Sequence, residues 1–201
     1  MAESPEAGPA AMIAGHFGFA AAVKSREHET PLWALMFATV WLDIVFIPLL
    51  LSGVETVTPT SPGYGGLVIF ADYDHSIVGM TVLSAILGLL AALLWGRRVG
   101  IVIGLVAASH WLLDLLFHRA DMPILPGNAG DLPRLGFGLW RHPQVAASIE
   151  LALVLIGAWL YWGAASRISK LAGRGRTAAA ATASLIAAFG VLILWLDFTA
   201  N

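Results

Sequence analysis

The 201-residue chain contains no cysteine and few charged residues. The absence of cysteine excludes disulfide bonds, thiolate metal sites and thiol catalysis, so any metal ion must take nitrogen and oxygen ligands. Charged residues make up 12% of the chain and hydrophobic residues 58%, and the mean hydropathy is +0.79. Because a soluble domain carries about 25% charged residues, this composition predicts a membrane protein.

The chain also lacks an excess of either charge. Eleven basic residues stand against 13 acidic ones, which gives a net charge of −2. A charge this small favours neither nucleic acid nor an anionic surface, so we expect no nucleic acid as a partner. The apolar composition instead predicts the lipid bilayer as a partner. Residues 1–9 lack the basic region of a cleaved signal peptide, and we expect the first apolar segment to stay in the mature protein.

Apolar runs separated by short polar segments predict an all-α fold. We expect a polytopic transmembrane helix bundle of five or six spans, with residues 1–201 forming a single transmembrane domain. The first run is short for a span and predicts a short helix, whereas Pro48 predicts a kink in the second. The runs cover residues 10–23, 31–51, 74–95, 99–117, 144–165 and 178–196.

The connections between these runs differ in composition. Residues 52–72 read as a loop rich in Gly, Pro, Ser and Thr, and the long Pro- and Gly-rich segment 118–143 is typical of a lid or binding loop. Small residues in the last run would permit close helix packing, including packing between copies in a homo-oligomer.

Basic residues predict the orientation of the chain. Eight of the eleven fall in segments 24–30, 96–98 and 166–177, which alternate with connections that are poor in Lys and Arg. Short basic loops stay in the cytoplasm. We therefore expect a multi-pass protein of a bacterial inner membrane, with both termini and the segments 52–72 and 118–143 on the periplasmic side.

One apolar run carries three ionisable side chains on one helical stripe. His110, Asp114 and His118 are spaced by four residues and fall within an arc of about 80°. An isolated carboxylate or imidazole in hydrocarbon costs at least a few kcal/mol. The stripe is therefore expected to face a protein interior or a wet cavity, where it is a candidate functional site.

Further His and Asp residues are expected at similar depth in the other runs. Histidine and carboxylate without cysteine form the ligand set of catalytic zinc, manganese and non-haem iron, and also suit copper or nickel. A pair spaced by four residues can bind one ion from a single helical face, and a divalent ion would offset the buried negative charge. The candidate metal ligands are His16, Asp43, His75, His110 and Asp114.

A bound ion of this kind activates water for hydrolysis, with a nearby acid or imidazole moving the proton. Asp74 and Glu150 are the candidate catalytic bases. His118, Arg119 and Arg141 lie at the outer rim and are candidate substrate-binding residues, because arginine can hold a phosphate or carboxylate.

Plainer interpretations are open for several of these residues. His110 with Asp114, and His16 with Asp43, could be buried hydrogen-bonded pairs that only stabilise the bundle. His118 could be solvated at the interface, and His142 beside Pro143 is typical of a loop residue.

Four short motifs resemble a known family. The chain is similar to a bacterial inner-membrane family of metal-dependent hydrolases, the LexA-regulated membrane hydrolase-like proteins, which is distantly similar to zinc-dependent phospholipase C. That resemblance implies a hydrolase with zinc as its cofactor. The matching stretches are Gly15-His16, Leu42-Asp43-Ile44, Asp74-His75-Ser76 and Ser109-His110-Trp111-Leu112-Leu113-Asp114.

The chain departs from the family pattern in two places. The second helix has one Asp followed by Ile44-Val45-Phe46 where the family has an Asp pair and a His. The third motif has Ala71-Asp72-Tyr73 in place of an upstream His-Arg-Gly. These departures leave fewer ligands for a second metal ion.

Three function classes remain on the sequence. The first is a membrane-embedded, metal-dependent hydrolase that acts from the periplasmic side on a lipid or small amphiphilic substrate, a phosphate ester among them. The second is a small permease or a proton- or cation-coupled transporter, and the third is a membrane-bound sensor. Because the ionisable residues gather at one side only, the sequence favours the hydrolase.

Overall fold

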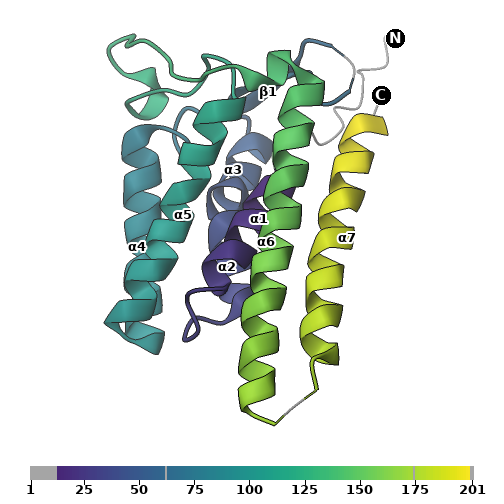
Figure 1. Cartoon of the computed structure of the whole chain (residues 1–201). Coiled ribbons are helices and arrows are strands. Elements are labelled where there is room, and N and C mark those ends of the chain that lie inside the picture. Colours follow the sequence, from purple (N-terminus) through teal and green to yellow (C-terminus); the bar gives the residue numbers. More distant parts are fainter. Residues whose placement is uncertain (1–12, 62, 174, 200–201) are drawn as a thin grey trace.

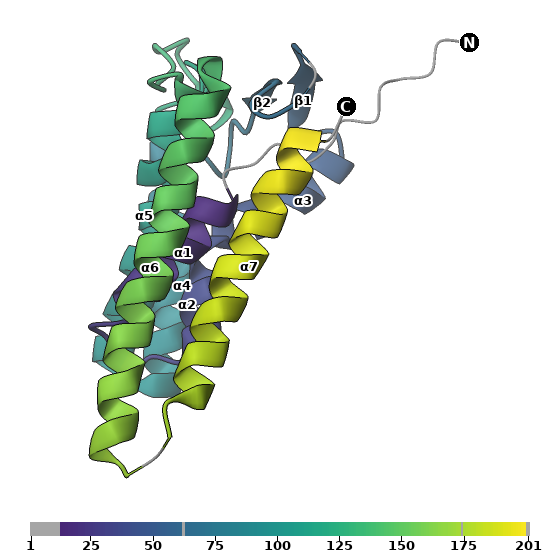
Figure 2. The same cartoon turned by 45° about the vertical axis from the view of Figure 1, so that its right-hand side comes forward.

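The computed structural model describes residues 13–61, 63–173 and 175–199 as a helix bundle with a small hairpin at one end (Figures 1 and 2). The helices are α1 (Ile13–Lys24), α2 (Leu32–Thr39), α3 (Trp41–Leu51), α4 (Ile77–Trp95), α5 (Arg97–Phe117), α6 (Pro143–Leu171) and α7 (Thr177–Thr199). The remaining elements are strands β1 (Thr56–Pro59) and β2 (Leu67–Phe70) and the 3-10 turns η1 (Pro126–Asn128) and η2 (Leu139–Arg141). The predicted all-α fold is confirmed.

Four helices, α4 to α7, are long and apolar enough to cross a membrane. A fifth crossing exists if α2 and α3, which are bent by 45° at Val40, form one broken span. The helix predicted to kink at Pro48 is instead bent at Val40, and α3 continues through Pro48. Helix α6 extends six residues beyond the predicted end at 165, because its last two turns contain good helix formers and no proline.

The short helix α1 lies among the longer helices rather than beside them (Figure 1). Small residues allow its backbone to approach α6 closely. A Cβ atom added to Gly157 of α6 would lie 2.0 Å from the carbonyl oxygen of Gly18, and one added to Gly18 would lie 2.5 Å from the backbone of Leu153. Two glycines thus set the depth of α1, which carries His16, in the bundle.

Small residues of α7, the last helix, pack against α6 of the same chain. A Cβ atom added to Gly190 of α7 would lie 2.6 Å from the side chain of Val154 on α6. Ala179 and Ala183 are also buried. Part of the small-residue surface that would permit packing between copies is therefore covered by α6.

The turns between helices lie at two ends of the bundle. The connections α1–α2, α4–α5 and α6–α7, which hold most of the basic residues, lie together at the lower end in Figure 1. Arg98 joins two of them through ion pairs of 3.2 Å to Glu27 and 3.0 Å to Glu29. The hairpin and the segment 118–142 occupy the opposite end.

The prediction that residues 52–72 form only a loop is wrong. β1 and β2 pair antiparallel, with Val57 opposite Ile69, because β-branched and apolar residues recur on both sides of the glycine-containing turn. The hairpin is attached to the segment 118–142, where Arg134 donates to a carboxylate oxygen of Asp72 at 2.9 Å and to the Asp121 carbonyl at 2.8 Å. The two connections thus form one layer over the end of the bundle.

Candidate metal centre

The structure brings all five predicted metal ligands together, within two overlapping groups. His16 comes from α1, Asp43 from α3, His75 from the turn before α4, and His110 and Asp114 from α5. Four of these residues are at most 4% exposed, whereas the Asp43 side chain is 28% exposed. One group joins His16, His110 and Asp114, and the other joins Asp43, His75 and His110.

The spacing of the ligand atoms suits a small divalent ion. His75 Nε2 and His110 Nε2 lie 3.1 Å apart, and Asp43 Oδ1 lies 3.8 Å and 3.5 Å from them. Asp114 Oδ2 approaches the same two nitrogens at 3.4 Å and 3.0 Å. Bonds of about 2.1 Å in a tetrahedral site place neighbouring ligand atoms about 3.4 Å apart. Each carboxylate therefore completes a triangle of the size of one tetrahedral face.

The outer nitrogen of each of two imidazoles is held by an oxygen acceptor. His110 Nδ1 donates to the Thr39 carbonyl at 2.7 Å, and His75 Nδ1 donates to Asp74 at 2.9 Å. These acceptors assign the ring protons to Nδ1 and leave Nε2 of each ring to face the centre. Second partners of this kind orient the histidines of metal sites.

This arrangement brings like atoms face to face. With a proton on each Nδ1, the two Nε2 atoms of His75 and His110 present lone pairs to each other across 3.1 Å. A proton or a metal ion between them removes that repulsion. Because two carboxylates, Asp43 and Asp114, adjoin the same pair, a divalent cation matches both the donor set and the charge.

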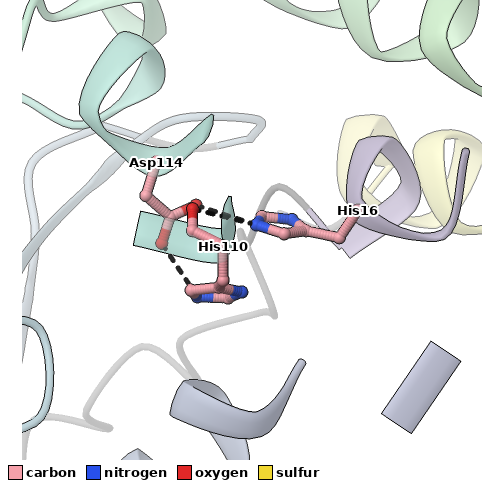
Figure 3. Close-up of side chains that lie close together, drawn as sticks. All are labelled: His16, His110 and Asp114. Atoms are coloured by element: carbon pink, nitrogen blue, oxygen red, sulfur yellow. Dashed lines mark hydrogen bonds and ion pairs between the residues drawn. The ribbon is translucent and has the colours of Figure 1, made fainter. Parts of the chain in front are cut away.

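His16 and His110 approach different oxygen atoms of the Asp114 carboxylate (Figure 3). Its Nε2 lies 3.5 Å from Asp114 Oδ1 and 3.3 Å from the carbonyl oxygen of His110. The His16 and His110 rings pack with their centroids 4.1 Å apart. His16 thus borders the centre from α1, next to His110 and at the second oxygen of the shared carboxylate.

His118 extends the α5 stripe towards the loops. Its Nε2 lies 3.7 Å from Asp114 Oδ2, and its Nδ1 donates to Asp121 at 3.0 Å. The ring packs on Trp140 with a centroid distance of 4.4 Å and is only 4% exposed. The alternative of a solvated interfacial His118 is therefore wrong, because η2 covers this end of α5.

A cavity of about 240 Å³ adjoins the centre. Its polar side is formed by the five side chains of His16, Asp43, His75, Asp114 and His118. Its apolar side is formed by Ile13, Phe46, Ile47, Ile69 and Trp140. A lining of both polar and apolar side chains suits an amphiphilic molecule.

The two predicted bases lie behind ligands. Asp74 contacts the outer nitrogen of His75, so that it orients a candidate ligand. Glu150 is fully buried on α6, where it accepts hydrogen bonds from the Gly15 backbone at 2.9 Å and from the Tyr64 hydroxyl. Burial, and next the charge of Glu150, raises the pKa of Tyr64 well above its usual range. Tyr64 therefore stays protonated and fixes Glu150 beside α1.

The two predicted substrate-binding arginines are separated from the centre. Arg119 donates to the Gly65 carbonyl at 3.3 Å, and Arg141 is exposed in η2. Between the hairpin and the centre lies Glu55, which accepts a hydrogen bond from the Tyr73 backbone at 2.9 Å. Burial, and next the charge of Asp74, raises the pKa of the Glu55 carboxyl to about 7.

Sequence reasoning missed the residues that support the ligands. The Thr39 carbonyl cannot be found from a residue pattern, because any residue offers a carbonyl group. Asp121 lies three residues after His118, a spacing that could have been noticed as a His–Asp pair. Phe46 and Ile47 follow Asp43 by three and four residues and therefore share its face of α3.

No family model matches the chain, and no curated protein or solved structure matches it. The interpretation of the site rests on its own geometry.

Proposed function

We propose that this chain is a membrane-embedded, metal-dependent hydrolase. The substrate would be a lipid or another amphiphile with a hydrolysable ester, a phosphate ester among them, and zinc would be the metal. The observation that carries the proposal is the pair of imidazole Nε2 atoms, 3.1 Å apart, flanked by two carboxylates that line a cavity. Structural ion pairing alone does not require two imidazoles with fixed tautomers to face each other.

The residues present fit a divalent ion, and different residues would bind the ion, orient the imidazole rings and accept a proton. His75, His110, Asp43 and Asp114 would hold it, and Asp74 and the Thr39 carbonyl would keep the rings oriented. When bound, such an ion polarises an ester and lowers the pKa of water towards about 7. His118 lines the cavity and accepts a proton at Nε2, while Asp121 holds its Nδ1 proton.

The distribution of polar residues favours a hydrolase over a permease. A transporter needs polar groups along a route to both faces of the membrane. In the described part of the chain, residues 31–42 and 99–109, which lead away from the centre in α2 and α5, contain no ionisable side chain and share an apolar cluster. Because these segments offer no polar route to the other end of the bundle, the centre resembles the end of a cavity rather than a step in a pathway.

The proposed location is the periplasmic side of a bacterial inner membrane. The centre lies towards the end of the bundle that holds the hairpin, because His75 precedes α4 and because His110 and Asp114 lie in the second half of α5. The three basic turns lie at the other end (Figure 1). Short basic turns are retained in the cytoplasm.

Hydrolysis by purified protein tests the proposal. We expect detergent-purified protein loaded with zinc to hydrolyse at least one member of a panel of phospholipids and other lipid esters, and a chelator to abolish this activity. Asp114→Asn is expected to lose the activity, while His28→Ala, an exposed histidine near the basic turns, keeps it. Protein that binds zinc stoichiometrically yet hydrolyses nothing in the panel would contradict the proposal, and proton flux in proteoliposomes would then indicate the permease.

A further inference from the structure

The cavity beside the metal centre reaches the surface along α3. Asp43, on this helix, has a side chain that is 28% exposed, whereas those of His75, His110 and Asp114 are at most 5% exposed. Phe46 and Ile47 continue the same helical face as far as the surface, where Ile47 is 53% exposed. The side of α3 is therefore where a molecule could approach the centre.

The loop end of the cavity is closed by contacts between the two outer connections. Asp121 accepts a hydrogen bond from the Ile69 backbone at 3.3 Å, and the same carboxylate holds His118. Arg134 then joins the Asp121 carbonyl to Asp72 at the end of the hairpin. With Trp140 only 2% exposed beneath them, these contacts favour access from the side of the bundle rather than from above.

The surface around the mouth has the character of a lipid-facing surface. α3 belongs to the bent helix pair that is apolar enough to span a membrane. From residue 31 to residue 54 the chain has one ionisable side chain, Asp43, and it points to the centre. The exposed residues of α3 include Ile47 and Leu51, so hydrocarbon chains rather than water fit this surface.

We infer that the cavity opens sideways into the bilayer along α3, and that the substrate is a membrane lipid whose reacting headgroup enters while its chains stay in the bilayer. The volume of about 240 Å³ is below the 300–1,000 Å³ typical of sites that enclose a whole small ligand. It holds an ester group and the first part of a chain, which would lie against Phe46 and Ile47. The side opening rests on the geometry alone, whereas the identity of the substrate rests on the proposed function.

The orientation of the mouth can be measured without any activity. Because the chain has no cysteine, Ile47→Cys can carry a single spin label in proteoliposomes. Leu93→Cys, at an 84% exposed position on α4, is the lipid-facing standard, and Thr58→Cys on the exposed side of β1 is the aqueous standard. We expect the label at 47 to collide with dissolved oxygen as at 93. Preferential collision with a water-soluble nickel chelate, as at 58, would overturn the side opening.

The contact with the lipid chain is tested by one polar substitution and its matched control. Ile47→Gln is expected to reduce kcat/KM at least tenfold for a long-chain lipid and less than twofold for a short-chain, water-soluble ester with the same headgroup. Leu51→Gln changes the same helix outside the cavity, at a position that is 82% exposed, and is expected to leave both values unchanged. An equal loss for both substrates in Ile47→Gln would overturn the chain contact. Absence of all hydrolysis in the zinc-loaded wild type would instead refute the proposed function and leave the spin-label result standing.

Discussion

His110 belongs to both groups that could hold a metal ion, so its replacement has the largest expected effect on metal affinity. His110→Gln keeps most of the side-chain volume in a site that is 1% exposed and removes the nitrogen that both groups share. His16→Ala leaves the group of Asp43, His75 and His110 complete, and Asp43→Ala leaves the group of His16, His110 and Asp114 complete. If the site is built around His110, zinc affinity should fall further in His110→Gln than in His16→Ala or Asp43→Ala.

The size of the effect follows from the energy per ligand. Structural zinc sites with four ligands bind with about 10–16 kcal/mol, or about 3 kcal/mol per ligand. Loss of His110 is then expected to weaken zinc binding at least about a hundredfold. His16→Ala should cost only about tenfold, because His16 contacts Oδ1 of Asp114, whereas His75 and His110 both contact Oδ2.

Zinc competition with a chromophoric chelator in detergent measures these affinities, and mass spectrometry of the metal measures stoichiometry. Circular dichroism and gel filtration confirm that each variant is folded, and His28→Ala controls for the loss of an exposed histidine. If folded His110→Gln bound zinc as tightly as the wild type, the shared-ligand geometry would be refuted. Equal losses in His16→Ala and His110→Gln would place the ion at His16 rather than between His75 and His110.

Three further predictions concern the surroundings of the centre. Asp74→Asn removes the charge behind a ligand histidine and is expected to weaken zinc binding about 10- to 100-fold in the same competition assay, with the fold intact. Gly157→Ala places a methyl group 2.0 Å from a carbonyl oxygen of α1 and is expected to destabilise the bundle by about 1–3 kcal/mol in thermal unfolding in detergent. Gly163→Ala is the control and should show no such loss, because a methyl group there meets nothing within 4 Å. The pKa of Glu55 is raised to about 7 in the folded state, against 4.5 for an exposed carboxyl, so the folded state binds this proton more tightly than the unfolded state. The stability that the protonated Glu55 contributes is therefore complete below pH 4.5 and is lost as the pH rises through 7. Glu55→Gln should flatten the decline of thermal stability in that window, and an unchanged decline would contradict the assignment.

Sequence patterning was sufficient to predict the class of fold and which His and Asp residues lie together in the candidate metal centre. Apolar runs with few charges fix the membrane-like helices, because hydrocarbon excludes unpaired polar backbone and favours helices. The same physics identified His16, Asp43, His75, His110 and Asp114, since each ionisable residue in an apolar run must find a polar partner. The five residues lie up to 98 positions apart, between His16 and Asp114, and periodicity could not show which of them share an ion.

Tertiary structure decided how these residues are arranged and what surrounds them. The bend at Val40 and the Thr39 carbonyl depend on packing against α5, which no local pattern records. The place of Glu150 behind α1, and not in the cavity, follows from the close approach of Gly18 and Gly157, which brings α6 against the first helix. The sequence alone therefore determined that buried imidazoles and carboxylates must meet, because an apolar environment penalises them singly. Only the packing of the helices decided which nitrogens face each other and which side chains line the cavity beside them.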